Sequence, residues 1–237
     1  LHLGVKRIMV GECGHAWRVA YSFWNTVAGV GSGAAEDDEY GQKLQKQLDH
    51  SYPIPQHICE FTYGLMQEGK LRLDPAANDH RTVTFHDSCN VARASRMGDK
   101  PGGQFDIPRA LLKAACNNYV DMEPDTIREV TYCCGGGGGL LTDDLMEIRV
   151  KGALPRMEAL KDVMENQGVT NMAAICAICK AQFAKVMPYF DIPMDTILST
   201  HQIVGDALVL TGSTQETALD GGDASSAEAE ETAEATE

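Results

Sequence analysis

Five of the eight cysteines in this 237-residue chain have a spacing that suits metal chemistry. Cys133 and Cys134 are adjacent and precede five glycines, Cys176 and Cys179 form a C-x-x-C pair, and Cys89 lies upstream of both. Thiolates are soft ligands that select iron–sulfur groups and other thiophilic metals. A mononuclear zinc site needs only four ligands, so five cysteines that meet in space favour an iron–sulfur group.

The elements before these cysteines explain how they could meet. Strand-like patterns cover Arg81–Phe85, Ile127–Tyr132 and Asn171–Ile175, and each is followed within a few residues by one or two of the five cysteines. Helix-like segments alternate with them, at Asp106–Tyr119 and from Thr142 to about Gln167. This alternation is typical of an α/β fold. Ligands gather at the carboxyl ends of parallel strands, so we expect a Rossmann-like parallel sheet with a cluster at that edge.

Further elements are expected around this core. They are a strand at Arg7–Val10, helices at Trp17–Val27, Gln42–His50, Gln56–Glu68 and His201–Leu210, a helix from Cys179 to Val186, and a loop at Gly29–Gly41. Pro108 is expected in the first turn of its helix, where its missing N–H costs nothing. The helix ending near Gln167 is expected to bend or break at Gly152 and Pro155.

The adjacent pair Cys133 and Cys134 requires a turn, because neighbouring side chains on a strand point to opposite faces. Gly135, Gly136 and the glycines that follow allow this turn and let backbone N–H groups approach the sulfurs. The helix beyond them should add positive potential. Such donors raise the reduction potential of an anionic cluster. The alternative is a flexible glycine loop beside two core thiols.

Each motif taken alone has another interpretation. The C-x-x-C pair is typical of a thioredoxin-like dithiol. A zinc ribbon would need a second C-x-x-C pair, which the sequence lacks. The glycine run lacks the Lys-Ser/Thr that completes a phosphate-binding loop.

The remaining cysteines and two polar residues are less informative. Cys59 and Cys116 are expected to be core residues. Cys13 follows a strand as Cys176 does, and both a structural role and a remnant metal site stay open for it. His86 and Asp87 are expected to hold their loop by hydrogen bonds, with proton supply as the alternative.

Composition narrows the classes of protein. The chain has Lys+Arg 20 and Asp+Glu 34, for a net charge of -14, which argues against a nucleic-acid partner. Residues 212–237 contain 8 of the acidic residues and no basic one, and their composition predicts disorder. No apolar run is long enough for a bilayer and no signal-peptide pattern is present, so we expect a soluble, cytoplasmic chain.

Three segments resemble a known family, the CCG domain of heterodisulfide reductase subunits. They are HDSCN at 86–90, CCGGGGGLLTDD at 133–144 and AAICAICKAQF at 174–184. Within this family they look most like the DsrK branch, the iron–sulfur catalytic subunits of the DsrMKJOP membrane complex in sulfur-metabolising prokaryotes. The resemblance covers about residues 1–211.

The resemblance implies a noncubane [4Fe–4S] cluster held by five cysteines. Carried over by position, the ligands are Cys89, Cys133, Cys134, Cys176 and Cys179. It further implies reduction of a disulfide or trisulfide of a DsrC-like protein in dissimilatory sulfur metabolism. Electrons would come from menaquinol through a membrane cytochrome subunit and other subunits of the complex. Such a subunit would lie on the inner face of the cell membrane, held there by its membrane partner.

The sequence also departs from the family pattern. Two-domain members carry the motif twice, but here Ala16 replaces the second cysteine of the C-x-x-C that would begin at Cys13, so one intact cluster site is expected. The chain has no ferredoxin-type C-x-x-C-x-x-C-x-x-x-C-P run and no initial Met, which predicts an N-terminally truncated piece. The expected domains are a remnant of a first CCG unit at 1–75, a complete CCG domain at 76–211 and an acidic tail at 212–237.

Two other functions stay open at this point. Iron–sulfur electron-transfer subunits of quinone-linked 2-hydroxy-acid or glycerol-3-phosphate oxidases share the CCG pattern. A non-enzymatic scaffold, whose cysteines bind zinc or nothing, is the second alternative.

Overall fold

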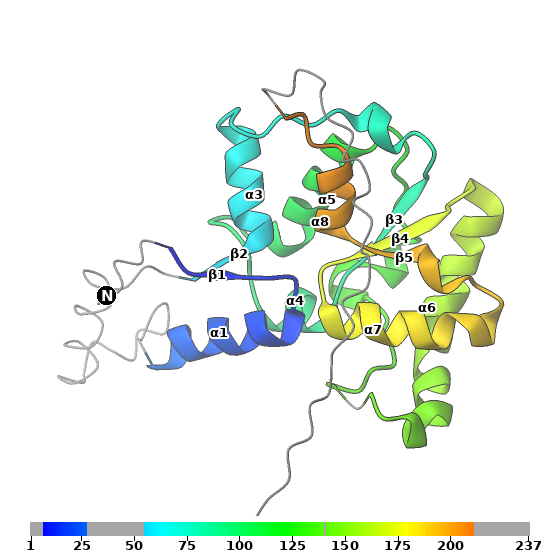
Figure 1. Ribbon diagram of the computed structural model, residues 1–237. Helices are drawn as coiled ribbons and strands as arrows, with labels where there is room; N and C mark the ends of the chain where they lie inside the picture. Colours follow the sequence, from blue (N-terminus) through cyan, green and yellow to red (C-terminus); the bar gives the residue numbers. More distant parts are fainter. Residues whose placement is uncertain (1–6, 28–54, 140, 211–237) are drawn as a thin grey trace, which may run out of the picture.

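A three-stranded parallel sheet forms the centre of the computed structural model, which describes residues 7–27, 55–139 and 141–210 (Figure 1). The strand order is β3 (Val83–His86), β4 (Asn171–Ala174) and β5 (Ile197–Ser199). All pairs are parallel, and at the carboxyl end Ala174 of β4 pairs with His86 on one side and Ser199 on the other. The prediction of an α/β fold with parallel strands is therefore confirmed.

Helices cover both faces of this sheet. On one face, α5 (Gly103–Ala115) and α8 (Thr200–Asp206) enclose a core that includes residues of β3 and β4. On the other, α6 (Met146–Gln167) and α7 (Ala177–Val186) pack on Met172 of β4. Both faces of β3 are buried, as is typical of parallel sheets.

The N-terminal elements adjoin this sandwich. Strand β1 (Met9–Val10) pairs in parallel with β2 (Gln56–His57), which leads directly into α3 (Ile58–Gln67). Helices α1 (Gly14–Val27) and α4 (Cys89–Ala94) contact each other. Trp17 of α1 and Cys59 of α3 lie in the same core cluster as Val83 of β3. The core thus extends across the expected boundary at residue 75, and the domain division stays a prediction.

The prediction of a strand at Ile127–Tyr132 is wrong. That segment forms 3₁₀ turns at Pro124–Thr126 and Arg128–Val130. The edge of β3 where it would pair is taken by residues 118–120, because Val83 N–H donates to Asn118 O and Val120 N–H donates to Val83 O. The third strand of the sheet is instead β5, which the sequence analysis did not identify.

Two proline-containing helices also differ from expectation. Helix α6 continues without a break through Gly152 and Pro155. Pro108 lies inside α5 rather than in its first turn, because that helix begins at Gly103, after Gly102 with a φ of 86°. The last helix, α8, ends at Asp206 instead of Leu210. The expected loop at 29–41, the helix at 42–50 and the acidic tail at 212–237 lie outside the described residues.

Gly152 is needed for packing rather than for a bend. A Cβ atom at Gly152 would lie 3.2 Å from Gly135 Cα, and one at Gly135 would lie 2.4 Å from Arg149 O. Gly135 also has a φ of 81°, which strongly favours glycine. The loop that carries the adjacent cysteines can therefore rest directly on α6.

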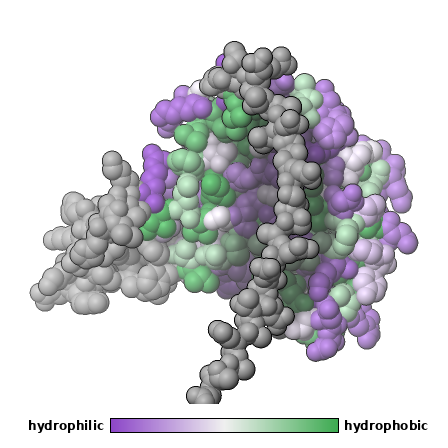
Figure 2. Space-filling view, viewed as in Figure 1, coloured by the Kyte–Doolittle hydropathy of each residue, from purple (hydrophilic) through white to green (hydrophobic). Residues whose placement is uncertain are grey.

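The surface is mixed in character. Hydrophilic residues cover much of the side that carries α6, whereas hydrophobic residues gather around α3 (Figure 2). Within the part of the chain that the structure describes, no helix combines the length and apolarity needed to span a bilayer.

The two helical glycines Gly64 and Gly152 should respond oppositely to alanine. Gly64→Ala places its Cβ in open space in α3, so the free energy of unfolding should rise by roughly 0.5–1 kcal/mol. Gly152→Ala should lower it, because the Cβ meets the backbone of Gly135. Urea unfolding of both variants tests this difference, and an equal gain in both would contradict the glycine-to-glycine contact.

Candidate metal centre

Three loops at the carboxyl edge of the sheet bring the five expected cysteines together. Cys89 begins α4 directly after β3, Cys176 is the N-cap residue of α7 directly after β4, and Cys179 lies in the first turn of α7. Cys133 and Cys134 arrive on the loop that rests on α6. Cys133 is exposed, Cys89 is half-buried and the other three are buried, so the site opens on one side.

The five thiols form a continuous row of side-chain contacts. The Cys89 thiol interacts electrostatically with that of Cys133, and the Cys133 thiol with that of Cys134. Cys134 continues the row to Cys179, and Cys179 to Cys176. Every cysteine predicted from the motif is in this row. Their role as ligands stays a prediction.

Two cysteines of the row, Cys133 and Cys176, have lowered pKa values, whereas the other three have raised ones. Hydrogen bonds from Cys134 and Cys89 hold the pKa of Cys133 well below its usual range. A hydrogen bond from Cys179 lowers the pKa of Cys176 to about 4 despite its burial. Donation to Cys133 correspondingly raises the pKa of Cys89, and that of Cys134 to about 12. A metal bound by these sulfurs would take them as thiolates, so its binding would release protons.

Backbone N–H groups point at the sulfurs, as the glycine run predicted. Gly135 N–H donates to Cys133 Sγ at 3.3 Å, and Gly136 N–H donates to Cys134 Sγ at 3.4 Å. The helix whose N-terminus lies beside the cysteines is α7, and not the helix after the glycine run that the sequence predicted. Helix α6 does not begin until Met146, whereas α7 begins immediately after Cys176.

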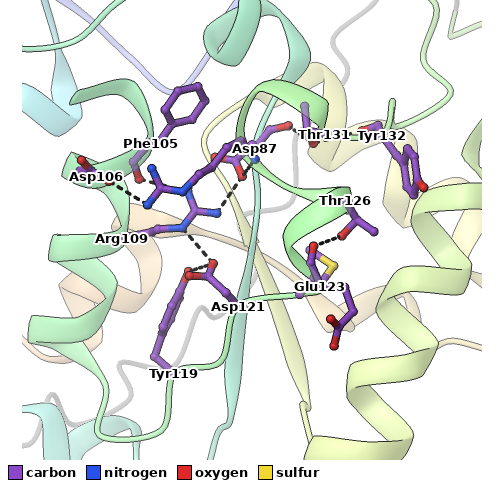
Figure 3. Close-up of polar contacts among 12 residues, drawn as sticks. Asp87, Phe105, Asp106, Arg109, Tyr119, Asp121, Glu123, Thr126, Thr131 and Tyr132 are labelled. Carbon is purple, nitrogen blue, oxygen red and sulfur yellow. Dashed lines mark hydrogen bonds and ion pairs between the residues drawn. The ribbon is translucent and has the colours of Figure 1, made fainter. Parts of the chain in front are cut away.

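A buried ion pair fixes the approach of the loops. Asp87, between β3 and α4, accepts two hydrogen bonds from the Arg109 guanidinium at 2.8 Å each, and both side chains are less than 5% exposed (Figure 3). Asp87 also accepts the N–H of Arg128 at 2.8 Å, and its backbone oxygen accepts the Thr131 hydroxyl at 2.9 Å. Arg109 Nε also donates a hydrogen bond to the Asp121 carboxylate. The expectation that Asp87 orients its loop is confirmed. The same expectation for His86 is wrong, because neither of its ring nitrogens has a hydrogen-bond partner.

A second buried arginine, on α6, donates hydrogen bonds to the segment that leads to Cys133. Arg156 of α6 donates to Thr131 Oγ1 at 3.0 Å and to the backbone oxygen of Thr126. Its guanidinium lies 5.6 Å from the ring centre of Tyr132, the residue before Cys133. These contacts hold the irregular segment at residues 126–132 in place, and most of that segment was predicted to be a strand.

The inner side of the site fits an anionic group. Arg156 is fully buried, its Nε has no hydrogen-bond partner, and no carboxylate of the described residues forms an ion pair with it. His86 is also fully buried, and neither ring nitrogen has a partner. The His86 ring packs edge-on against Phe183, 4.8 Å away and one helical turn after Cys179. A buried cation and an unpaired N–H are costly alone, so these residues fit an anionic cluster bound by the adjacent thiols.

The thiol row is not a preformed coordination sphere. Among residues 7–27, 55–139 and 141–210, no group of three or more His, Cys, Asp or Glu side chains is arranged to hold a metal ion.

The remaining cysteines take no part in this row. Cys59 and Cys116 are buried in the core cluster of α5 and α8, as expected. Cys13 Sγ accepts the N–H of Ala16 at 3.5 Å in the first turn of α1.

Glu12 also belongs to the neighbourhood of the site, although no sequence motif includes its side chain. Its carboxylate accepts hydrogen bonds from His201 N–H at 2.8 Å, His201 Nδ1 at 2.7 Å, Lys180 Nζ and the Ser199 hydroxyl. Burial alone would raise the pKa of Glu12, but these hydrogen bonds outweigh it and lower the pKa to about 2. The available signal was its position after β1, at an edge where polar groups converge.

Comparison with known proteins agrees with this geometry. The model of the cysteine-rich domain family CCG matches residues 83–184, which include the whole thiol row. An Hdr-like menaquinol oxidoreductase iron–sulfur subunit of Archaeoglobus profundus is 41% identical over 224 residues. The chain belongs to the CCG-domain, heterodisulfide-reductase-like family. That match covers 88% of this chain and 38% of the relative.

Two further relatives support the family. Hdr-like menaquinol oxidoreductase iron–sulfur subunit 2 of Archaeoglobus fulgidus is 38% identical over 221 residues, again 88% of this chain and 38% of that protein. A dihydromethanophenazine:CoB–CoM heterodisulfide reductase protein of Methanosarcina mazei is 33% identical over 105 residues, 41% of this chain and 23% of that relative. The chain thus spans well under half the length of each of these relatives.

Removing the buried charge of Asp87 should be far more damaging than removing an exposed one. Asp87→Asn leaves Arg109 without its bidentate partner and should lower the free energy of unfolding by about 3–5 kcal/mol. Asp106→Asn removes an exposed ion pair with Arg128 and should cost less than about 1 kcal/mol. Denaturant unfolding of the two variants measures the difference, and similar losses would show that Asp87 does not organise the loops.

Glu12 should make stability depend on acid pH. Its pKa is about 2 in the folded chain against an ordinary value of 4.5, so its contribution is complete above about pH 4.5 and is lost as the pH falls towards 2. The shift corresponds to about 3 kcal/mol. The stability advantage of the wild type over Glu12→Gln should therefore shrink between about pH 5.5 and pH 3 in urea unfolding. A constant difference would contradict the assignment.

Proposed function

We propose that the chain is the CCG part of an iron–sulfur subunit of a heterodisulfide-reductase-like oxidoreductase, with one [4Fe–4S] cluster bound by Cys89, Cys133, Cys134, Cys176 and Cys179. The observation that carries the proposal is the row of contacts among these five thiols. The names of the Archaeoglobus relatives, which combine an iron–sulfur subunit with a menaquinol oxidoreductase, support it. A bound cluster would supply electrons one at a time to a disulfide.

The protein's own residues would position and isolate that group. Gly135 and Gly136 donate N–H groups to two of the sulfurs, and Arg156 and His86 supply a buried cation and an unpaired ring nitrogen on the inner side. Together they would stabilise negative charge in a site from which water is largely excluded.

The open side of the thiol row is where a substrate would approach. Cys133 is exposed and Cys89 is half-buried. Asn90 borders this side, with its amide 3.9 Å from Cys89 Sγ and 3.1 Å from His15 Nε2. A disulfide on a partner protein could reach Cys133 there without disturbing the buried cysteines.

Within this function we propose the finer assignments that the motif resemblance implies. The cluster is of the noncubane type, and the branch is that of DsrK. The substrate is a disulfide or trisulfide of a DsrC-like protein in dissimilatory sulfur metabolism. Electrons arrive from menaquinol through a membrane cytochrome subunit of the same complex, which holds the chain at the inner face of the membrane.

Cysteine substitutions in anaerobically reconstituted protein test the ligand set. The wild type should bind about four irons with matching sulfide per chain. Cys133→Ser and Cys179→Ser should lose the cluster or change its type, because each removes a contact of the row. Cys116→Ser is the matched control, since this core thiol should leave the iron content intact. Equal iron loss in all three variants would refute the ligand set.

Electron paramagnetic resonance of the oxidised, reconstituted protein tests the reaction. A signal that changes when a thiol ligand is added supports disulfide chemistry at the cluster. A cluster with no thiol-sensitive signal would instead point to an electron-transfer subunit of a quinone-linked oxidase. Zinc without iron or sulfide would establish a non-enzymatic scaffold.

A further inference from the structure

The turn between β1 and α1 is joined to the thiol row. Glu12 O accepts the N–H of Ala177 at 2.8 Å, and Ala177 is the first residue of α7, directly after Cys176. The turn thus reaches the start of α7 by a backbone hydrogen bond between segments that lie far apart in the sequence. The chain continues from this turn to Ala16, which occupies the position of the second cysteine in a C-x-x-C pair that would begin at Cys13.

The Glu12 side chain holds this turn against α7, the end of β5 and the first turn of α8. One oxygen accepts from Lys180 and Ser199, and the other accepts from the backbone N–H and the ring Nδ1 of His201. Lys180 lies on α7 beside Cys179, and Ser199 ends β5. A carboxylate held by charge-assisted bonds from separate elements has little freedom to move, so the turn has a fixed position relative to α7.

Gly14 occupies the closest point of approach. A Cβ atom there would lie 2.7 Å from Ser88 Oγ, 3.2 Å from Val91 Cγ2 and 3.3 Å from Cys176 Sγ. Gly14 is buried and does not have a positive φ, so close approach rather than backbone conformation accounts for the glycine. The Gly14 backbone therefore lies directly against Cys176 Sγ.

We propose that the β1–α1 turn is a working part of the metal centre, in which the backbone N–H of Gly14 stabilises negative charge on Cys176 Sγ and Glu12 is the positioning residue that holds the turn in place. This inference rests on the proposed cluster. Backbone N–H groups beside ligating sulfurs stabilise the reduced, more negative state. The turn therefore helps to set the reduction potential of a cluster whose ligands all belong to the following CCG unit.

The matched pair Gly14→Ala and Gly11→Ala tests the proposal. Gly11 lies in the same turn, but a Cβ atom there meets nothing within 4 Å. The full chain of each variant is reconstituted anaerobically. Iron and sulfide are assayed, and the midpoint potential is measured by a redox titration followed by electron paramagnetic resonance. We expect Gly14→Ala to lose iron or to titrate at a more negative potential, and Gly11→Ala to match the wild type.

The outcomes separate this inference from the proposed function. A wild type that takes up no iron and sulfide would refute the proposed function itself. A wild type that binds the cluster, with Gly14→Ala unchanged or with both variants altered equally, would overturn the role of the turn alone.

The variant Glu12→Gln gives a second test that keeps Gly14 intact. If circular dichroism shows that Gly14→Ala fails to fold, this second variant tests the role of the turn instead. The amide cannot accept all four hydrogen bonds of the carboxylate. We expect the iron content to be retained and the midpoint potential to become more negative. An unchanged midpoint potential would overturn the positioning role of Glu12.

Discussion

The buried carboxylate of Asp87 is the contact on which the arrangement of the site depends. It stands at the end of β3, pairs with Arg109 of α5, and accepts the N–H of Arg128 from the segment that leads to the adjacent cysteines. One charged group thereby sets the distance between Cys89 on one loop and Cys133 on another. Because a buried carboxylate is tolerated only when its hydrogen bonds are complete, these elements cannot separate without a large cost.

The polar groups around the thiols are arranged for negative charge. Glycine N–H groups point at Cys133 and Cys134, and Arg156 is a buried cation without a carboxylate in contact among the described residues. Donors in excess of acceptors are unusual inside a protein. They are explained if the fold is completed by an anionic iron–sulfur group, and the same donors would then adjust its potential.

Sequence patterns located the strands that bury both faces, and they failed where polar side chains replace the sheet. Val83–His86 and Asn171–Ala174 have the short apolar pattern of buried parallel strands, and the prediction lay within two residues of each. Ile127–Tyr132 has a similar pattern, yet its Arg128 N–H donates to Asp87 and its Thr131 hydroxyl accepts from Arg156, and both partners are distant in the sequence. Helix α6 remains unbroken past Gly152 because packing on Gly135 outweighs local propensity.

The sequence by itself determined the five cysteines, the glycines that let N–H groups approach them, and the alternation of strands and helices, because these follow from residue type and local spacing. The tertiary structure alone decided that the cysteines form a row, that Arg156 and His86 are close enough to act on it electrostatically, and that Gly14 lies against Cys176 while Glu12 bonds to Ala177. The same packing joins Glu12 to His201, 189 positions away in the sequence. Only the packing of the sheet and helices brings such residues together, and no local pattern encodes it.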